Sequence, residues 1–178
     1  ENYVIGSLND KDILDEVTKN VDIVIHLASV TQESSKRENY NVNFIGTKNL
    51  VEACEKNKVK KIIYTSTVNA FFKKRGHYGN SKLMADELIR NSRLNFIILR
   101  LNMVYGNRDN NLNKTINIIK KLPFIPIIGN GKSLIQPVYV EDVVDVIMKC
   151  INGRLNNKIY DIGGPNSFSF NDYIEIIS

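Results

Sequence analysis

The chain has 178 residues with a formal net charge of +5, and 43% of its residues are hydrophobic. This composition is ordinary for a globular protein that can bury a substantial core. The charge could suggest an anionic partner, but the lysines are scattered and no aromatic residues alternate with them, so we expect no nucleic-acid partner. No apolar run is long enough to span a bilayer and no signal-peptide pattern is visible, so we expect no membrane partner and a cytoplasmic location.

Segments of two kinds alternate along the chain. Continuous apolar runs, typical of strands buried on both faces of a parallel sheet, are found at residues 3–5, 21–27, 61–66, 96–101, 137–140 and 158–162. Apolar positions with helical spacing are found at residues 40–56, 78–90, 111–121 and 143–151, in a short helix that Asn9 or Asp10 would cap, and from about Asn171 onward. This alternation predicts an α/β fold with a doubly wound parallel sheet.

Small and hydroxyl residues follow two of the predicted strands. Ala28 and Ser29 come after the run at 21–27. The run that begins at residue 61 leads into the hydroxyl residues Thr65, Ser66 and Thr67. In open α/β sheets, ligands bind at the carboxyl ends of the strands, where small residues let them approach the backbone. We therefore expect a binding site at this edge of the sheet.

Other residues with reactive side chains are expected to be structural. His26 lies within a predicted strand, where a packed and hydrogen-bonded side chain is expected rather than a catalytic one. Cys54 and Cys150 are far apart in apolar helical patterns, and no metal-ligand spacing occurs. We therefore expect neither a disulfide framework nor a metal site.

Tyr78 and Lys82 lie four residues apart on a predicted helix, so their side chains share one face. Together with the hydroxyls that end the preceding strand, they offer a proton donor, a cation to tune it, and a second donor for a carbonyl oxygen. Such a set suits hydride transfer. The pair alone is a weak motif, and the alternative is an exposed aromatic residue beside a solvated lysine.

Seven motifs, in order along nearly the whole chain, are similar to those of the extended short-chain dehydrogenase/reductase family, also called the NAD-dependent epimerase/dehydratase family. The motifs are H-L-A-S at residues 26–29, N-F-I-G-T at 43–47, T-S-T at 65–67, Y-G-N-S-K at 78–82, L-R-L-N-M-V-Y-G at 99–106, Q-P-V-Y-V-E-D-V at 136–143 and I-G-G-P at 162–165. The resemblance implies a Rossmann-like fold, NAD or NADP as cofactor, a small-molecule substrate and a homodimer.

The resemblance also shows what the chain lacks. It begins at what resembles the family's third strand, so that the first two strands and the glycine-rich turn are missing. Either these residues are the ordered part of a longer protein, or the chain is truncated. We expect the first, because a sheet without its central strand would expose unpaired edges. Residues 1–105 would form an incomplete dinucleotide-binding part. Residues 106–178 would supply substrate-side segments interleaved with late strands and helices, all in one compact unit.

The family's chemistry, carried over to matching positions, implies a Ser/Thr-Tyr-Lys site. Tyr78 would be the general acid/base, and Lys82 would lower the pKa of its phenol and bond the nicotinamide ribose. Thr67 would hold the substrate oxygen, with Ser66 as the fallback if the register slips by one residue. Asn43 would support the site from its helix.

Cofactor contacts implied by the resemblance lie on both sides of this site. Ala28 and Ser29 would line the cofactor through their backbone. Ser7 stands where relatives often carry an Asp that bonds adenine, and Leu101 stands where many carry Pro. The residue that separates NAD from NADP follows a strand that the chain does not contain, so the cofactor stays open between the two.

Departures from the family pattern bear on the substrate. Asn102 lies beside Met103, which occupies the position of an Asn in nucleotide-sugar enzymes. Ile135, followed by Gln136, occupies the position of an Arg that grips a diphosphate, which an Ile cannot do. Either Arg108 serves instead, or the substrate lacks a diphosphate.

Two classes of function follow from these residues. The first is an NAD(P)-dependent epimerase, dehydratase or reductase, acting on a nucleotide sugar or on a non-nucleotide ketone or alcohol. The second is a non-catalytic relative that keeps the fold as a dinucleotide-binding scaffold. Retention of Tyr78, Lys82 and Thr67 together favours the enzyme, since a scaffold does not need all three.

Overall fold

The computed structural model describes residues 3–31, 34–107, 109, 119 and 130–177. The chain divides into two units. Unit 1 contains residues 1–100 and 147–161, and unit 2 contains residues 101–146 and 162–178. The predicted boundary at residue 105, with interleaved segments after it, stays a prediction. A single compact unit stays a prediction.

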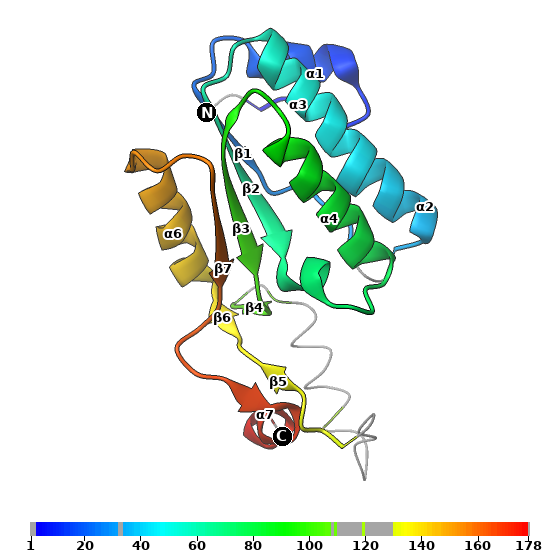
Figure 1. The fold of residues 1–178 in the computed structure, drawn as a ribbon, viewed down its shortest axis with the longest axis vertical. Helices are drawn as coiled ribbons and strands as arrows, with labels where there is room; N and C mark the ends of the chain where they lie inside the picture. Colours follow the sequence, from blue (N-terminus) through cyan, green and yellow to red (C-terminus); the bar gives the residue numbers. More distant parts are fainter. Residues whose placement is uncertain (1–2, 32–33, 108, 110–118, 120–129, 178) are drawn as a thin grey trace. The chain divides into compact units, whose positions relative to one another are not determined.

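Unit 1 is built on a four-stranded sheet in the order β1-β2-β3-β7 (Figure 1). The strands are β1 (Ile23–His26), β2 (Lys61–Thr67), β3 (Asn95–Leu101) and β7 (Lys158–Ile162). β1 and β2 pair in parallel, with Ile23 opposite Lys61 and His26 opposite Tyr64. The predicted Rossmann-like α/β fold with a parallel sheet is confirmed, and three of the predicted strand positions differ from the structure only at their ends.

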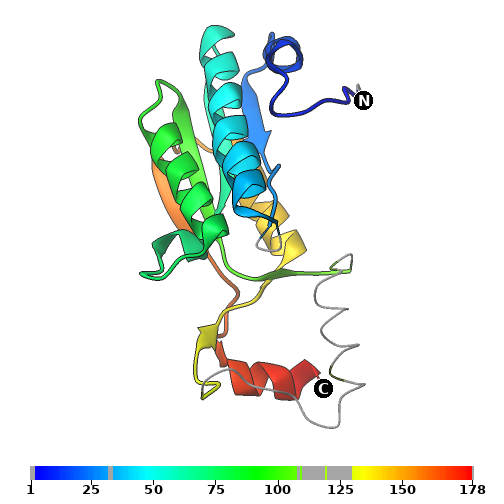
Figure 2. The same cartoon turned by 90° about the vertical axis from the view of Figure 1, so that its right-hand side faces the viewer.

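Helices cover both faces of this sheet, as Figure 2 shows. One face carries α1 (Lys11–Thr18), α3 (Thr47–Lys56) and α4 (His77–Arg90), and the other carries α6 (Val140–Asn152). Ile62, Tyr64 and Ile98 of the strands pack with Leu50 of α3 and Ile89 of α4 in one buried cluster. Burial of such side chains contributes roughly 1.5–3 kcal/mol each, so this cluster fixes α3 and α4 on the sheet.

The helix expected at residues 40–56 has three parts. A capping box between Ser35 and Glu38 starts it earlier, as α2 (Lys36–Glu38). A π-helix, η1 (Asn39–Gly46), follows and leads into α3. The wider turn of a π-helix is rare and often found at functional sites. Here it carries the buried side chains of Asn39 and Asn43.

The described residues of unit 2 include two small sheets and the helix that follows them. β4 (Val104–Tyr105) pairs in parallel with β6 (Val138–Tyr139), and β5 (Leu134–Ile135) pairs antiparallel with β8 (Phe168–Ser169). The helix α7 (Phe170–Ile177) follows directly. A Cβ at Gly164 would clash with the carbonyl oxygen of Pro137, so only glycine allows this approach of two backbone segments.

Several sequence predictions need correction or lie outside the described residues. Residues 3–5 form no strand, and their side chains are exposed, because no described strand pairs with them. The helix expected at 143–151 begins at Val140, so Glu141 and Asp142 lie in its first turn rather than before it. The helix expected at 111–121 falls outside the described residues, except for Ile119.

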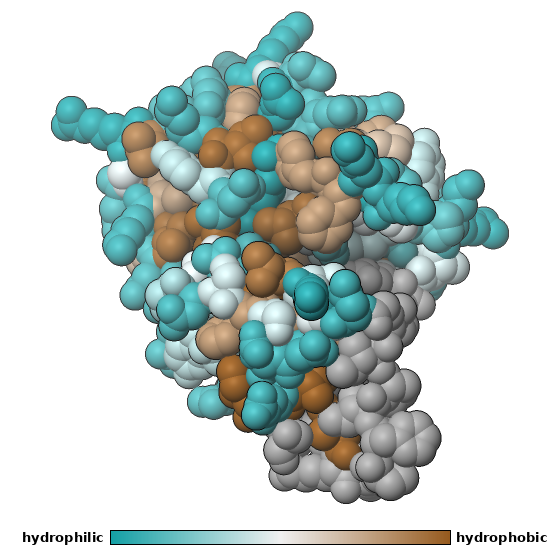
Figure 3. All heavy atoms as spheres, turned by 60° about the horizontal axis from the view of Figure 1, so that its bottom comes forward, coloured by the Kyte–Doolittle hydropathy of each residue, from teal (hydrophilic) through white to brown (hydrophobic). Residues whose placement is uncertain are grey.

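The face shown in Figure 3 is mostly polar, with apolar residues in scattered patches. Exposed apolar side chains of the chain include Ile25 and Leu27, together with Val144 and Met148 of α6. Scattered apolar residues are normal on a protein surface, so we assign no function to them.

Candidate active site

The hydroxyl residues at the end of β2 point to different neighbours. Ser66 is buried, and its hydroxyl lies near the carboxylate of Asp86 on α4, whose pKa it lowers. Thr67 caps the 3-10 helix η2 (Val68–Phe71), since its Oγ1 accepts a 3.3 Å hydrogen bond from the Asn69 amide. The Thr67 hydroxyl also lies near the phenol of Tyr78, whose pKa it lowers. Thr67, rather than Ser66, is therefore beside Tyr78.

Tyr78 lies half-buried in the first turn of α4. Burial raises the pKa of its phenol, and the contact with Thr67 opposes that shift. The expected lowering of this pKa by Lys82 stays a prediction, and loss of water around the phenol outweighs the effect of Thr67. The next residue, Gly79, lets α4 approach η2, since a Cβ there would lie 2.7 Å from the Asn69 carbonyl oxygen.

Lys82 is 2% exposed, which is unusual for a lysine. Its Nζ donates a 2.7 Å hydrogen bond to the carbonyl oxygen of Thr65 and lies 4.2 Å from the centroid of the Tyr64 ring. Burial lowers the pKa of Lys82 to about 7, while Asp86 opposes the shift. Near neutral pH the side chain is therefore divided between ammonium and amine.

Asn43 joins the loop after β1 to α4. Its Oδ1 accepts a 2.9 Å hydrogen bond from the Val30 amide, and its Nδ2 donates to the Val30 carbonyl oxygen at 3.0 Å and to Ser81 Oγ at 3.1 Å. Val30 follows directly on Ala28 and Ser29, whose side chains are exposed. Asn43 therefore holds the loop expected to line the cofactor, as its supporting role requires.

His26 is packed and hydrogen-bonded, as the sequence predicted. Its Nε2 lies 2.8 Å from Thr47 Oγ1, and its ring stacks on Tyr64 with centroids 5.1 Å apart. The Thr47 hydroxyl donates to the Asn43 carbonyl oxygen at 2.7 Å, so the shared proton between Thr47 and His26 comes from Nε2. Burial lowers the pKa of His26 to about 3, with Lys82 adding to the shift. The imidazole is therefore neutral near pH 7.

The remaining predicted residues are not brought to this site by any described contact. Ser7 is exposed, and its Oγ accepts from the Asn9 amide at 3.2 Å. Leu101 and Asn102 begin unit 2, where the Asn102 amide donates to the Ile162 carbonyl oxygen at 2.9 Å. Gln136 donates to the Gly164 carbonyl oxygen at 2.6 Å. Arg108 lies outside the described residues.

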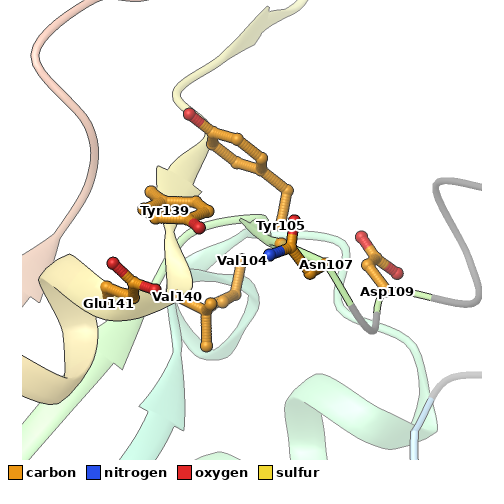
Figure 4. Close-up of a pocket in the computed structure, with 8 residues that line it drawn as sticks. Val104, Tyr105, Asn107, Asp109, Tyr139, Val140 and Glu141 are labelled. Atoms are coloured by element: carbon orange, nitrogen blue, oxygen red, sulfur yellow. The ribbon is translucent and has the colours of Figure 1, made fainter.

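Unit 2 contains a pocket of about 460 Å³ that the sequence did not predict. In Figure 4 the rings of Tyr105 and Tyr139 lie close together, with Glu141 and Asp109 on opposite sides of the pocket. The ring centroids are 5.5 Å apart with a 48° tilt. The V-Y-G and V-Y-V-E motifs contribute six of the lining residues, so motif position was the signal that could have located this pocket.

Metal sites and membrane-spanning helices are both absent from the described part of the chain. No group of three or more His, Cys, Asp or Glu side chains there is placed to hold a metal ion. Among the described helices, none combines the length and apolar character needed to cross a membrane.

A model described as the NAD dependent epimerase/dehydratase family matches residues 2–163. The chain belongs to this family. The predicted family assignment is therefore confirmed. The family assignment alone does not choose among the epimerases, dehydratases and dehydrogenases found among the relatives of this chain.

The curated relatives of this chain include proteins named as enzymes and proteins named as subunits of a larger complex. It is 28% identical to an N-acetyl-alpha-D-glucosaminyl-diphospho-ditrans,octacis-undecaprenol 4-epimerase of Escherichia coli O157:H7, over 96% of the chain and 58% of the relative. It is 29% identical to the alpha subcomplex subunit 9 of mitochondrial NADH dehydrogenase of Arabidopsis thaliana, over 94% of the chain and 42% of the relative. The chain thus spans about half the length of the curated relatives that it matches.

Solved structures share the fold. UDP-glucuronic acid 4-epimerase from Bacillus cereus, in complex with NAD, superposes with a TM-score of 0.85 at 23% identity, over 99% of this chain and 65% of the other. A dTDP-glucose 4,6-dehydratase from Streptomyces venezuelae, with NAD bound, has the same TM-score at 20% identity, over 99% of this chain and 62% of the other. At these identities the likeness shows the fold alone.

Proposed function

We propose that this chain carries the hydride- and proton-transfer site of an NAD(P)-dependent epimerase, dehydratase or reductase. The observation that carries the proposal is the 2.7 Å hydrogen bond from Lys82 Nζ to the Thr65 carbonyl oxygen, which holds α4 against the end of β2, where the Thr67 hydroxyl lies near the Tyr78 phenol. A strand-end hydroxyl, a phenol and a lysine are thus assembled from two elements. A scaffold would need none of these contacts.

In this proposal Tyr78 exchanges a proton with the oxygen of the substrate. Its raised pKa keeps the phenol protonated, which suits donation to a carbonyl oxygen as the carbon is reduced. Thr67 Oγ1 accepts from the Asn69 amide, so the Thr67 hydroxyl keeps its own proton for donation, which in this proposal turns from the Tyr78 phenol to the same substrate oxygen when substrate binds. The two donors together would stabilise negative charge there.

The described residues fit the nicotinamide end of a dinucleotide. Asn43 bonds the backbone of Val30 and so holds the adjacent exposed residues Ala28 and Ser29. The buried Lys82 side chain would donate a hydrogen bond to a ribose hydroxyl. When bound, the cofactor supplies or accepts the hydride. No glycine-rich phosphate turn occurs in the 178 residues, so we assign no residue to the pyrophosphate.

For the substrate, we propose a nucleotide sugar, with Asn102, Arg108 and Gln136 as contacts. This choice draws on the names of the relatives, several of which are nucleotide-sugar epimerases or dehydratases. A non-nucleotide alcohol or ketone is the alternative. It is favoured by Ile135 at the position of a diphosphate-binding Arg, and by 30% identity over 80% of the chain to human sterol-4-alpha-carboxylate 3-dehydrogenase.

The experiment uses the full-length protein. NAD⁺ and NADP⁺ are first compared by the rise in Tm that each produces, because a ligand that binds only the folded state stabilises it. Panels of UDP- and dTDP-sugars and of sterol alcohols are then added to the complex, and absorbance at 340 nm reports hydride transfer. A change with a member of either panel supports the enzyme and selects the substrate class. Because an epimerase or dehydratase regenerates its cofactor within each turnover, the products are also analysed by NMR. Cofactor binding without any change in absorbance or in any substrate across both panels would contradict the proposal.

A scaffold is the second candidate, favoured by the Arabidopsis relative that is named as a subunit of NADH dehydrogenase. A scaffold predicts a stable assembly with other proteins and no turnover. Size-exclusion chromatography with light scattering separates this outcome from the homodimer that the family resemblance predicts. A cytoplasmic location also stays a prediction, which imaging of a tagged full-length protein would check.

A further inference from the structure

Asp86 is a buried carboxylate that the proposed mechanism does not use. It lies on α4, four residues after Lys82, and is 1% exposed. Its Oδ2 accepts a 3.2 Å hydrogen bond from Nε of Arg100 on β3, whose side chain is 11% exposed. A buried ion pair like this is strongly destabilised when one partner is removed, because the other charge is left uncompensated.

Arg100 has a second contact on its other side. Its guanidinium carbon lies 3.5 Å from the centroid of the Phe71 ring, at the end of η2. The Thr67 side chain caps the start of the same 3-10 helix. Arg100 therefore joins α4, which carries Tyr78 and Lys82, to the turn that carries Thr67. A planar guanidinium suits this double role, because it can pair edge-on and stack face-on.

The pair also sets the charge around Lys82. Asp86 raises the pKa of Lys82 against the effect of burial. The other titratable groups that face Lys82 are Tyr64 of β2, His26 of β1 and Tyr78 of α4, and none brings a negative charge at neutral pH. Burial raises the pKa of Asp86 itself, while Ser66, Arg100 and Lys82 lower it. Asp86 is therefore the nearby carboxylate that compensates two buried cations.

We propose that Asp86 and Arg100 form a positioning pair, which holds the Thr67 turn against α4 and favours the ammonium form of Lys82 in its buried position. What this arrangement serves rests on the proposed function, whereas the pairing itself rests on the contacts above. No comparison assigns a role to either residue. Neither is catalytic in the sense of touching the reacting atoms.

The competing explanation is that the pair only stabilises the fold, and two variants of the full-length protein separate these roles. Asp86→Asn keeps the size of the side chain but removes the charge. The double variant Asp86→Leu with Arg100→Met removes both charges, and such apolar replacements often restore or increase stability. Glu87→Gln, on the exposed face of α4, is the matched control.

The first readout does not require activity. The protein is labelled with ¹³C-lysine, and the NMR chemical shift of Lys82 Cε is followed as the pH is changed. The signal is assigned by its absence from the spectrum of Lys82→Met. We expect Asp86→Asn and the double variant both to lower the apparent pKa of Lys82, which leaves about tenfold less ammonium at pH 8 for a shift of one unit. Glu87→Gln should leave it unchanged. Titration as in the wild type in the double variant would overturn the proposal.

The second readout applies if the full-length protein turns over. We expect kcat/KM near pH 7 to fall about tenfold or more in the double variant even where its Tm equals that of the wild type. Asp86→Glu keeps the carboxylate, so kcat/KM should fall less in this single variant than in the double variant. Recovery of both Tm and kcat/KM in the double variant would show a purely structural pair. If the wild type shows no turnover, the proposed function fails, and the Lys82 titration still decides the role of the pair.

Discussion

Nζ of Lys82 donates a 2.7 Å hydrogen bond to the carbonyl oxygen of Thr65, inside a site where the lysine is almost fully buried. The backbone of β2 thus provides the acceptor, and the ring of Tyr64 provides a second favourable surface at 4.2 Å. Together these contacts replace the water that would solvate the Lys82 ammonium at the surface. The cost of burial is seen in the pKa of Lys82, which falls to about 7.

This pKa predicts how stability depends on pH. The folded value of about 7 lies below the ordinary value of 10.5, so between these limits the unfolded state binds more protons and stability rises with pH. The full effect corresponds to about 5 kcal/mol. We expect the unfolding free energy of the wild type to rise relative to that of Lys82→Met from pH 7 to pH 10 in urea titrations. Lys73→Met, at an exposed position, is the control, and an equal pH dependence in both variants would refute the prediction.

His26 predicts a similar effect in acid. Its folded pKa of about 3 lies below the ordinary 6.5, so the neutral imidazole stabilises the fold above pH 6.5 and this contribution is lost as the pH falls toward 3. The shift amounts to about 5 kcal/mol. Acid unfolding followed by circular dichroism should therefore be less steep in His26→Gln. His77→Gln, exposed at the start of α4, should follow the wild-type curve, and a steepness unchanged in His26→Gln would contradict the account.

Some features of this site could be predicted from the sequence, and others could not. The three hydroxyls at the end of β2 and the spacing of Tyr78 and Lys82 were readable, because strand and helix periods fix where such residues point. The choice between Thr67 and Ser66 was not readable, since it depends on which residue caps η2. The pKa of Lys82 was also not readable, because spacing says nothing about burial.

Other elements show the same division. The S-K-R-E capping box at residues 35–38 could have placed the start of the helix before Tyr40, but the π-helix has no apolar period that separates it from an α-helix. The pairing of Asp86 with Arg100 joins residues 14 apart on different elements, so only the fold shows it. An apolar stretch such as residues 3–5 resembles a strand, but a strand also requires a partner.

Thr67 is expected to matter more than its neighbour. Thr67→Val removes both the cap of η2 and the donor beside Tyr78, so we expect kcat to fall about 10–100-fold. Thr67→Ser keeps the hydroxyl and should retain most of the activity. Steady-state kinetics of these variants and of Ser66→Ala test the assignment. A larger loss in Ser66→Ala than in Thr67→Val would move the role to Ser66.

Two glycines at the start of α4 form a matched pair. A Cβ at Gly79 would lie 2.7 Å from the Asn69 carbonyl oxygen, whereas at Gly76 nothing lies within 4 Å. Gly79→Ala should therefore push η2, and Thr67 with it, away from α4. We expect about a tenfold or greater loss of kcat, because small displacements of reacting groups are costly. Gly76→Ala should behave as the wild type in the same assay, and equal losses in both variants would count against the geometry.

The central claim is that Tyr78 transfers the proton beside a bound nicotinamide. Tyr78→Phe keeps the ring and removes the hydroxyl, and Tyr40→Phe does the same at an exposed position on η1. The most direct measurement is a single-turnover recording at 340 nm of the full-length protein with its cofactor and the substrate found by screening, together with the Kd of the cofactor. We predict a loss of about 10²–10⁴-fold in rate for Tyr78→Phe, with the cofactor Kd nearly unchanged and Tyr40→Phe as active as the wild type. A Tyr78→Phe variant that turns over at the wild-type rate would contradict the account.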